Sequence, residues 1–244
     1  MSDDAKKEAT KLKSALTRRV KKLIAQTLEP LGFTQDKDDK QGWTRTAEIM
    51  SHYCQFHYWN GYLVVDYGVG RVSRFDAWAN APQDAATQKK LKRFWKEHRE
   101  QEDEGWVATA EQKTWQGPPK SEEEIEAILT GVEAFLRDEV TPYFRRFATV
   151  ADVLREYDAG RLDKEFFDMD EEFWQDFYLA LTRFHVGAYA EAAAAFEAAV
   201  EYIETSPDWD LEDEDEDMVP AVEAARIGAD CMRRLVESQG KAGE

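Results

Sequence analysis

Cysteine and histidine are scarce in this chain, and their spacing excludes the usual metal sites. Only two cysteines, Cys54 and Cys231, occur among 244 residues, and they lie in different segments. A disulfide is unneeded, and two buried thiols in a cytoplasmic chain are the simpler interpretation. The four histidines form no HxxxH or HExxH pattern, and CxxC is absent. We therefore expect neither zinc nor another bound metal.

Long apolar runs and an excess of positive charge are also missing. No run of about 18 apolar residues exists, so no transmembrane helix is expected. The first residues, MSDDAKKEATKLK, are charged and predict no signal peptide. With 50 acidic against 32 basic residues, the net charge is −18. This charge disfavours nucleic acids and anionic membranes as partners, and it favours a basic protein.

Sequence motifs of common catalytic sites are absent as well. There is no GxSxG, and Gly68-Val69-Gly70 is too short for a phosphate loop, so a kinked strand is expected there. Cys54 is better explained as a small buried side chain than as a nucleophile. The segment 213–217 begins like an EF-hand but lacks the loop glycine and the final glutamate. We expect no cofactor, although a catalytic pair among fifty acidic residues stays open.

The most distinctive stretch that is present runs from residue 42 to residue 72. It is rich in aromatic and β-branched residues and nearly free of charge, a composition typical of strands. We predict three antiparallel strands, near 43–50, 52–59 and 62–71. Asn60-Gly61 separates the second from the third, and Asn-Gly is the strongest short hairpin signal.

Alternation along the second strand predicts two different faces. Cys54, Phe56 and Tyr58 would point into a core, whereas Tyr53, Gln55, His57 and Trp59 would point the other way. The aromatic candidates for partner binding are Trp43, Tyr53, His57, Trp59 and Tyr62. Either helices cover these side chains, or they form an exposed platform of the kind where interface hot spots concentrate.

Helical periodicity surrounds the predicted strands. Apolar stripes, caps and breakers predict a fourth strand at 105–115 and helices at 4–31, 87–102, 121–140 and 149–157. Ser121 and Glu124 form a capping-box pattern, and Pro142 predicts a bend. The order predicts an α+β domain over residues 1–158, with a small antiparallel sheet of about four strands packed with helices.

Several segments of this domain resemble a known bacterial family. They are LEPLGF at 28–33, the GWTRT strand, YLVVDYGV, and EAFLRDEVTPYFRRFATVADVL at 133–154. The pattern resembles domain-of-unknown-function family 4304 over roughly residues 10–158. The resemblance implies a fold but no catalytic residues. Families of this type are similar to small immunity proteins that accompany bacterial toxins.

The remainder, residues 159–244, is predicted to be helical. The spacing of small and aromatic residues over 177–204 is typical of one tetratricopeptide-like hairpin, and a cap helix is predicted at 219–238. An acidic linker, 208–217, separates them. A lone repeat cannot bury its own face, so we expect this part to pack on the first domain or on a partner.

A second candidate surface combines acidic and aromatic residues near the ends of this hairpin. Its members are Asp170, Glu171, Glu172, Phe173, Trp174, Asp213 and Asp215. Carboxylates beside aromatic rings would suit a steered interface with a basic partner. The alternative is a solvated acidic rim whose aromatic side chains turn into the core.

Two functional hypotheses follow. The first is a non-enzymatic, acidic, cytoplasmic binding protein, in its concrete form an immunity protein that neutralises a basic toxin. The second is an enzyme with an unrecognised site in a cleft between the sheet and the helices. The sequence names no catalytic residue for the second hypothesis.

Overall fold

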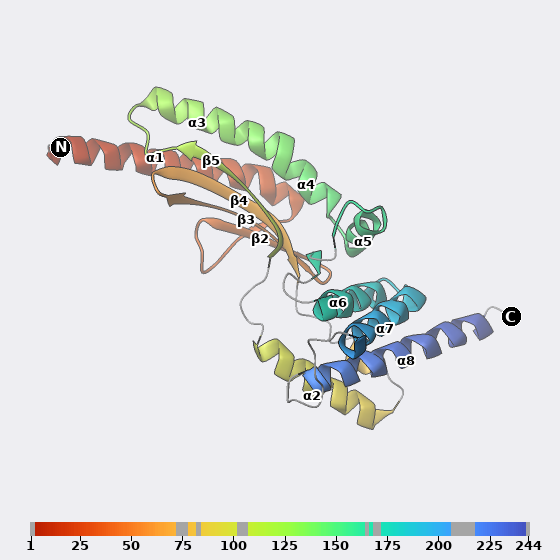
Figure 1. Ribbon diagram of the computed structural model, residues 1–244. Helices are drawn as coiled ribbons and strands as arrows, with labels where there is room; N and C mark the ends of the chain where they lie inside the picture. Colours follow the sequence, from red (N-terminus) through yellow and green to blue (C-terminus); the bar gives the residue numbers. More distant parts are fainter. Residues whose placement is uncertain are drawn as a thin grey trace. The chain divides into compact units, whose positions relative to one another are not determined.

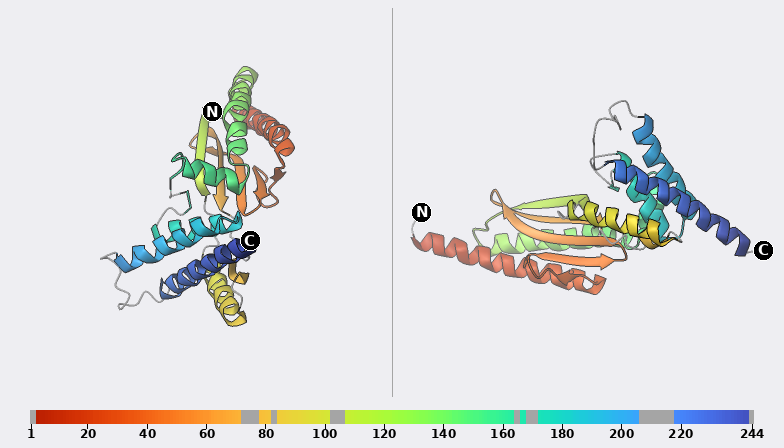
Figure 2. Two further views of the ribbon diagram at one scale, coloured as in Figure 1. Left: turned by 90° about the vertical axis from the view of Figure 1, so that its right-hand side faces the viewer. Right: turned by 90° about the horizontal axis from the view of Figure 1, so that it is seen from below.

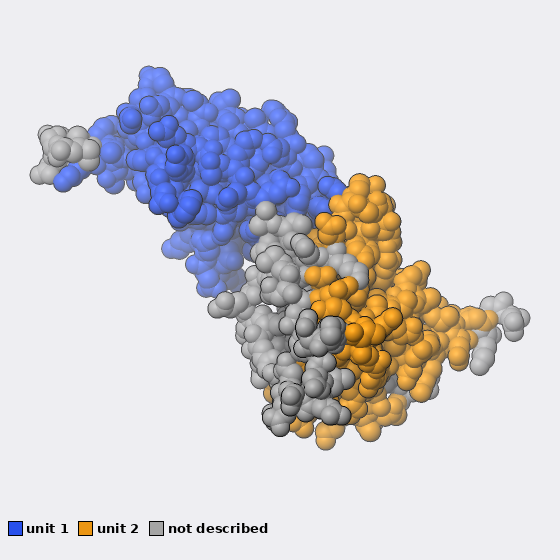
Figure 3. Space-filling model, in the orientation of Figure 1, with its two compact units in different colours: residues 1–70, 109–148 blue, residues 71–108, 149–244 orange. Residues whose placement is uncertain are grey.

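The chain forms two compact units in the computed structural model, which describes residues 3–71, 78–81, 84–101, 107–163, 166–167, 172–205 and 218–242. Unit 1 comprises residues 1–70 and 109–148, and unit 2 comprises residues 71–108 and 149–244 (Figure 3). The sequence predicts one boundary near residue 158. The chain instead leaves unit 1 after its fourth strand and returns with its fifth.

Unit 1 is built on one antiparallel sheet of five strands, in the order β1-β2-β3-β4-β5. The strands are β1 (Thr34–Gln35), β2 (Gly42–Ala47), β3 (Met50–Trp59), β4 (Tyr62–Arg71) and β5 (Val107–Gln116). The α+β class is therefore confirmed. The short β1 pairs with β2, with Thr34 opposite Thr44 and Gln35 opposite Trp43.

Two tight turns fix how β2, β3 and β4 align. Asn60 and Gly61 both have positive φ, 48° and 83°, which is the geometry of a type I′ hairpin turn. This two-residue turn places Trp59 opposite Tyr62. Glu48 and Ile49 form the preceding turn, since Ala47 pairs with Met50.

Two long helices cover one face of the sheet. They are α1 (Asp3–Leu28) and α3 (Glu122–Phe135), which lie alongside each other on that face (Figures 1 and 2). A short 3₁₀ turn, η1 (Glu29–Leu31), follows α1. The predicted apolar stripe of α1 is buried against strand residues; it comprises Leu12, Leu16, Val20, Ile24 and Leu28.

The α3 helix begins with the predicted cap and ends in an irregular turn. Ser121 Oγ accepts a hydrogen bond from the Glu124 amide at 3.3 Å, while the Glu124 carboxylate accepts from the Lys120 amide at 2.6 Å. A π-helical turn, η3 (Leu136–Val140), joins α3 to α4 (Thr141–Arg146). Pro142 lacks an amide hydrogen, so the wider turn occurs where the regular bonding pattern is interrupted.

The secondary structure of unit 2 is helical in its described residues, apart from the strand ends at residues 71 and 107–108. It contains η2 (Trp78–Asn80), α2 (Ala85–Gln101), α5 (Val150–Asp158), α6 (Glu172–His185), α7 (Tyr189–Thr205) and α8 (Met218–Ala242). A short connection joins α6 to α7, and Gly187 within it has a φ of 78°. Helices α6, α7 and α8 pack successively, as expected for a hairpin followed by a cap helix.

An aromatic cluster explains why residues 71–108 belong to unit 2. The Trp78 ring centroid lies 5.7 Å from that of Phe177 and 5.8 Å from that of Phe196. Phe177 and Phe196 are 5.3 Å apart across the α6–α7 hairpin. Trp78 is 1% exposed, so it completes the interior that the hairpin cannot fill by itself.

Helix length and charge both bear on membrane insertion. The longest described helices, α1 and α8, have 26 and 25 residues, a length that could cross a bilayer. Each carries many charged side chains. No helix in the described part of the chain combines the required length with the required hydrophobicity.

Gly131 of α3 provides a test of packing in unit 1. A Cβ atom at Gly131 would lie 2.6 Å from Trp115 Nε1 on β5. We expect Gly131→Ala to lower the free energy of unfolding by about 1–3 kcal/mol, because the indole must shift. Gly240→Ala is the control, since a Cβ there meets nothing within 4 Å. If urea denaturation gave the Gly131→Ala variant the same free energy of unfolding as the wild type, this packing would be contradicted.

Candidate functional site

The face of the sheet opposite α1 and α3, which we call the outer face, is the candidate site. Alternation and strand pairing place on it Thr44, Thr46, Ser51, Tyr53, Gln55, His57, Trp59, Tyr62, Val64, Asp66, Gln112, Thr114 and Gln116. Among the described side chains, Asp66 is the only carboxylate on this face, and no lysine or arginine lies there. In a chain with 34% charged residues, such a face is unusually poor in charge.

The accessible part of the outer face is its hairpin end. Trp59 is 64% exposed and Tyr62 is 45% exposed. These two side chains lie opposite each other across the Asn60-Gly61 turn. Farther along the face, Val64 is buried and Tyr53 is half-buried. The sequence-based expectation of outward aromatic side chains therefore applies most directly to Trp59 and Tyr62.

Asp66 organises the polar side chains next to this aromatic pair. Its Oδ2 atom lies 3.1 Å from His57 Nδ1 and accepts a hydrogen bond from Gln55 Nε2 at 3.3 Å. The imidazole ring of His57 therefore has its Nδ1 atom beside the Asp66 carboxylate of β4. The Asp66 side chain is 15% exposed and that of His57 is 44% exposed.

Tyr53 extends this cluster but does not supply a base. Burial, together with the negative charge of Asp66, raises the pKa of Tyr53 to about 12. The phenol therefore stays neutral near pH 7 and can only donate or accept a hydrogen bond. The sequence-based candidates did not include Asp66, although strand alternation and the Asn-Gly turn place it opposite Gln55.

Trp43 does not belong to the outer face, which corrects the sequence-based grouping. It is 1% exposed and stacks on Phe56, with ring centroids 6.2 Å apart, on the helix-covered side. Trp43 pairs with Cys54, and directly paired residues share a face. The turn that sets this register, Glu48-Ile49, carries no recognisable turn signal.

His52 lies on the helix-covered side as well. Its Nε2 atom donates to the Phe147 carbonyl at 2.6 Å, which ties β3 to the end of α4. Its Nδ1 atom is buried without a hydrogen-bond partner among the described atoms. Burial is the largest influence on His52 and lowers its pKa, so the ring is neutral in the folded protein.

The second predicted surface is only partly described, and the described part requires a correction. Phe173 is fully buried in α6 and packs on Phe177 at a centroid distance of 5.8 Å. Trp174 is half-buried against Phe177, 5.4 Å away, whereas Glu172 is exposed. Asp170, Glu171, Asp213 and Asp215 lie outside the described residues. Phe173 faces the core because it lies four residues before Phe177 on the same helix face.

Charge is distributed very unevenly between the two units. Unit 2 contains 33 of the 50 acidic residues but 16 of the 32 basic residues, which gives it a net charge of −17. Unit 1 contains the other 17 acidic and 16 basic residues and has a net charge of −1. The acidity of the chain thus belongs almost entirely to the helical unit.

Two hollows in the described surface have no histidine in their lining. One in unit 1, of about 820 Å³, is lined mainly by apolar residues such as Leu12, Pro119 and Ile128, with Glu8, Lys120 and Glu124 among its polar ones. No His or Cys lines it. Among the described residues, no three His, Cys, Asp or Glu side chains are grouped so that they could hold a metal ion.

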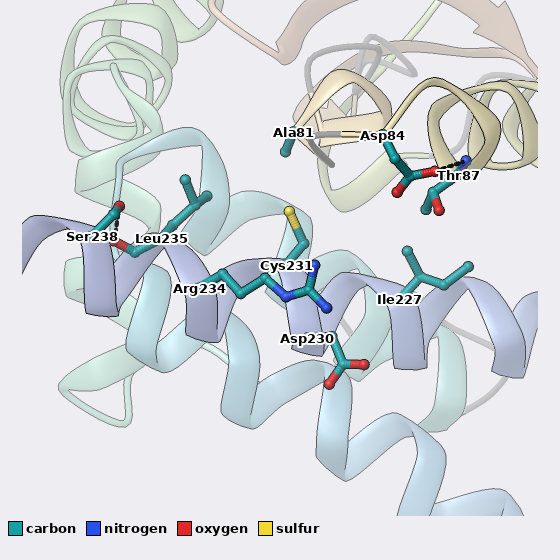
Figure 4. A pocket seen from close by; sticks show the side chains of 9 residues that line it. All are labelled: Ala81, Asp84, Thr87, Ile227, Asp230, Cys231, Arg234, Leu235 and Ser238. Atoms are coloured by element: carbon teal, nitrogen blue, oxygen red, sulfur yellow. Dashed lines mark hydrogen bonds between the residues drawn. The ribbon is translucent and has the colours of Figure 1, made fainter.

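A smaller hollow of about 180 Å³ lies in unit 2 beside α8 (Figure 4). Asp84 Oδ1 accepts from the Thr87 amide at 2.8 Å and so caps α2. Cys231 is free and buried, and burial raises the pKa of its thiol. Cys54 is likewise free and buried, with its pKa raised by burial. Both thiols are protonated and poor nucleophiles near pH 7.

Removing a tryptophan from the core face should lower the free energy of unfolding far more than removing one from the outer face. Trp43→Ala should lower the free energy of unfolding by about 3–5 kcal/mol, because it leaves a cavity in the core. Trp59→Ala should change it by less than about 0.5 kcal/mol, since the side chain is mainly in solvent. Denaturant titrations of both variants test this assignment, and equal losses would contradict it.

The buried His52 predicts a pH dependence of stability. Its folded-state pKa is lowered, so the unfolded chain binds the proton more readily below the unfolded pKa of about 6.5. Stability should therefore be retained above that pH and lost as the pH falls through 6.5 toward the lower folded value. His52→Gln should reduce this slope in denaturation experiments at a series of pH values. The same slope in both proteins would exclude His52 as the source.

Comparison with known proteins adds no relative. No family model, curated protein or solved structure matches the chain. The resemblance to family 4304 therefore stays a hypothesis.

Proposed function

We propose that the protein is a non-catalytic binding protein whose partner, a basic protein, docks on the hairpin end of the outer face. The observation that carries the proposal is the exposure of Trp59 and Tyr62, 64% and 45%, on a face almost without charge. Aromatic residues are enriched and charges are depleted at the centres of protein interfaces. Tyrosine and tryptophan also dominate interface hot spots.

The polar neighbours of this pair support a protein as the ligand. The hydrogen bond from Gln55 to Asp66, and the position of His57 Nδ1 3.1 Å from the same carboxylate, hold these side chains in place before binding. Preorganisation of this kind reduces the entropy lost on association. Thr114 and Gln116 add exposed hydroxyl and amide groups on neighbouring β5, which can hydrogen-bond a partner at the rim of the aromatic pair.

The net charge supports a basic partner. Unit 2 carries −17 and unit 1 carries −1. In this proposal unit 2 supplies long-range attraction that raises the encounter rate, and the aromatic pair of unit 1 supplies short-range affinity. A basic toxin neutralised by this protein is the concrete form of the proposal. The cytoplasm, which the two protonated thiols suit, is the proposed location.

The alternative function, an enzyme with a site in a cleft between the sheet and the helices, has less support. Apolar side chains fill the described space there, among them Phe56, Leu63, Val65 and Phe144. The polar groups of that interior, such as His52, hold strands to helices. An oriented imidazole does exist at His57, but it lies on the outer face.

Binding to the product of a neighbouring gene tests the proposal. The full chain should bind a basic protein encoded beside it, and replacement of both Trp59 and Tyr62 by alanine should weaken that binding about a hundredfold. The loss should come mainly from faster dissociation. Association should slow as ionic strength rises, because salt screens the charge of unit 2. Surface plasmon resonance measures both rates.

A matched variant controls for general effects of truncation. Val219→Ala combined with Val236→Ala removes two exposed apolar side chains of α8, 52% and 39% exposed, and should leave binding unchanged. Unaltered affinity in the Trp59 and Tyr62 variant would reject the docking face. Association that does not depend on salt would reject the steering of a basic partner.

A further inference from the structure

The two edge strands of the sheet differ greatly in length. One edge is β1, which has two residues, whereas the other is β5, which has ten. Residues 111–114 and 116 of β5 are exposed, and Trp115 is partly buried. A long edge strand presents unpaired backbone groups to any other strand that can approach it. Natural proteins usually shorten or cover such edges, as β1 illustrates.

The backbone groups that face the open edge can be identified. The Gly117 amide donates to the Gly61 carbonyl at 2.8 Å, so Gly117 faces the β3–β4 hairpin. Backbone groups alternate in direction along an antiparallel strand. Those of Lys113 and Trp115 therefore face β4, and those of Gln112, Thr114 and Gln116 face outward.

Charge on this strand is arranged in a self-complementary way. Glu111 and Lys113 lie on its helix-covered side, where Glu111 accepts from Tyr67 Oη at 2.7 Å and Lys113 Nζ lies 2.6 Å from Glu139. In an antiparallel pair of two copies centred on Gln112, Glu111 of each copy lies opposite Lys113 of the other. This register also uses the outward backbone groups of Gln112 and Thr114 for hydrogen bonds.

Neighbouring registers are less favourable. Pairing centred on Lys113 would place two lysines opposite each other, which is destabilising. Pairing centred on Thr114 would place Lys113 opposite Trp115 and would leave both charges without an opposite neighbour. A lysine on an edge strand often prevents such pairing. Lys113, however, is held by Glu139 and lies 4.9 Å from the centroid of the Phe135 ring.

We propose that β5 is a self-association edge: two copies of this chain pair antiparallel along β5 about a two-fold axis at Gln112, so that one continuous sheet spans both. The interface is isologous, as a two-fold axis requires. Two paired strands bury less area than the roughly 1,600 Å² of a standard interface, so the dimer is weak and concentration-dependent. The charge of −18 on each copy opposes association most at low salt.

Charge-reversed variants of the full chain give a sharp test by sedimentation velocity at physiological ionic strength. Lys113→Glu puts glutamates opposite each other, and Glu111→Lys does the same with lysines. For each variant alone, the dimer dissociation constant should be at least about tenfold higher than for the wild type. An equimolar mixture should form a heterodimer with nearly wild-type affinity, because every pair is again of opposite charge.

Controls separate edge pairing from damage to the fold. Lys37→Glu makes the same charge change on an exposed loop and should leave dimerisation unchanged. Thr114→Pro removes an outward amide that β4 does not use, and it should abolish dimerisation without altering the circular-dichroism spectrum. A wild-type protein that is monomeric at every concentration would overturn the proposal. A mixture no more associated than its separate components, or unimpaired dimerisation of Thr114→Pro, would do the same.

Discussion

The register of the β3–β4 hairpin is the constraint on which unit 1 depends. Asn60 and Gly61 both adopt positive φ, and the turn matches the natural twist of the strands. Since side chains alternate, this alignment places Phe56 and Val65 under the helices and leaves Trp59 and Tyr62 in solvent. A slip of one residue would exchange the two faces and expose the core.

The same alignment assembles polar groups from distant positions. Gln55 and His57 on one strand converge on Asp66 of the next: Gln55 Nε2 donates to Asp66 Oδ2, and His57 Nδ1 lies 3.1 Å from the same oxygen. On the opposite side, His52 and the helix-facing apolar residues hold the sheet to α3 and α4. The two faces of β3 and β4 thus differ: one packs under the helices, and the other carries the polar and aromatic side chains of the candidate site.

In unit 2, the core forms around Phe196 of the α6–α7 hairpin. A single helical hairpin cannot bury both of its apolar faces, and here Phe196 of α7 is covered from several directions. Trp78 and Phe177 pack on its ring, and a Cβ at Gly228 of α8 would approach it to 2.7 Å. The absence of a side chain at Gly228 permits this approach. Unit 2 also carries nearly all of the net negative charge of the chain.

Local sequence alone determined the Asn-Gly hairpin, the alternation of β3, the buried stripe of α1 and the α6–α7 hairpin, because each depends on neighbours within a few residues. The tertiary structure decided the rest. Trp43 is a core residue because of the strand register set by the turn at Glu48-Ile49, which has no typical sequence signal. Phe173 and Phe177 lie on the same face of α6, and the packing of that face in the folded protein buries both. Trp78 joined unit 2 through contacts with residues about a hundred positions away. Such contacts depend on which surfaces meet in three dimensions, and periodicity in a single sequence does not encode that choice.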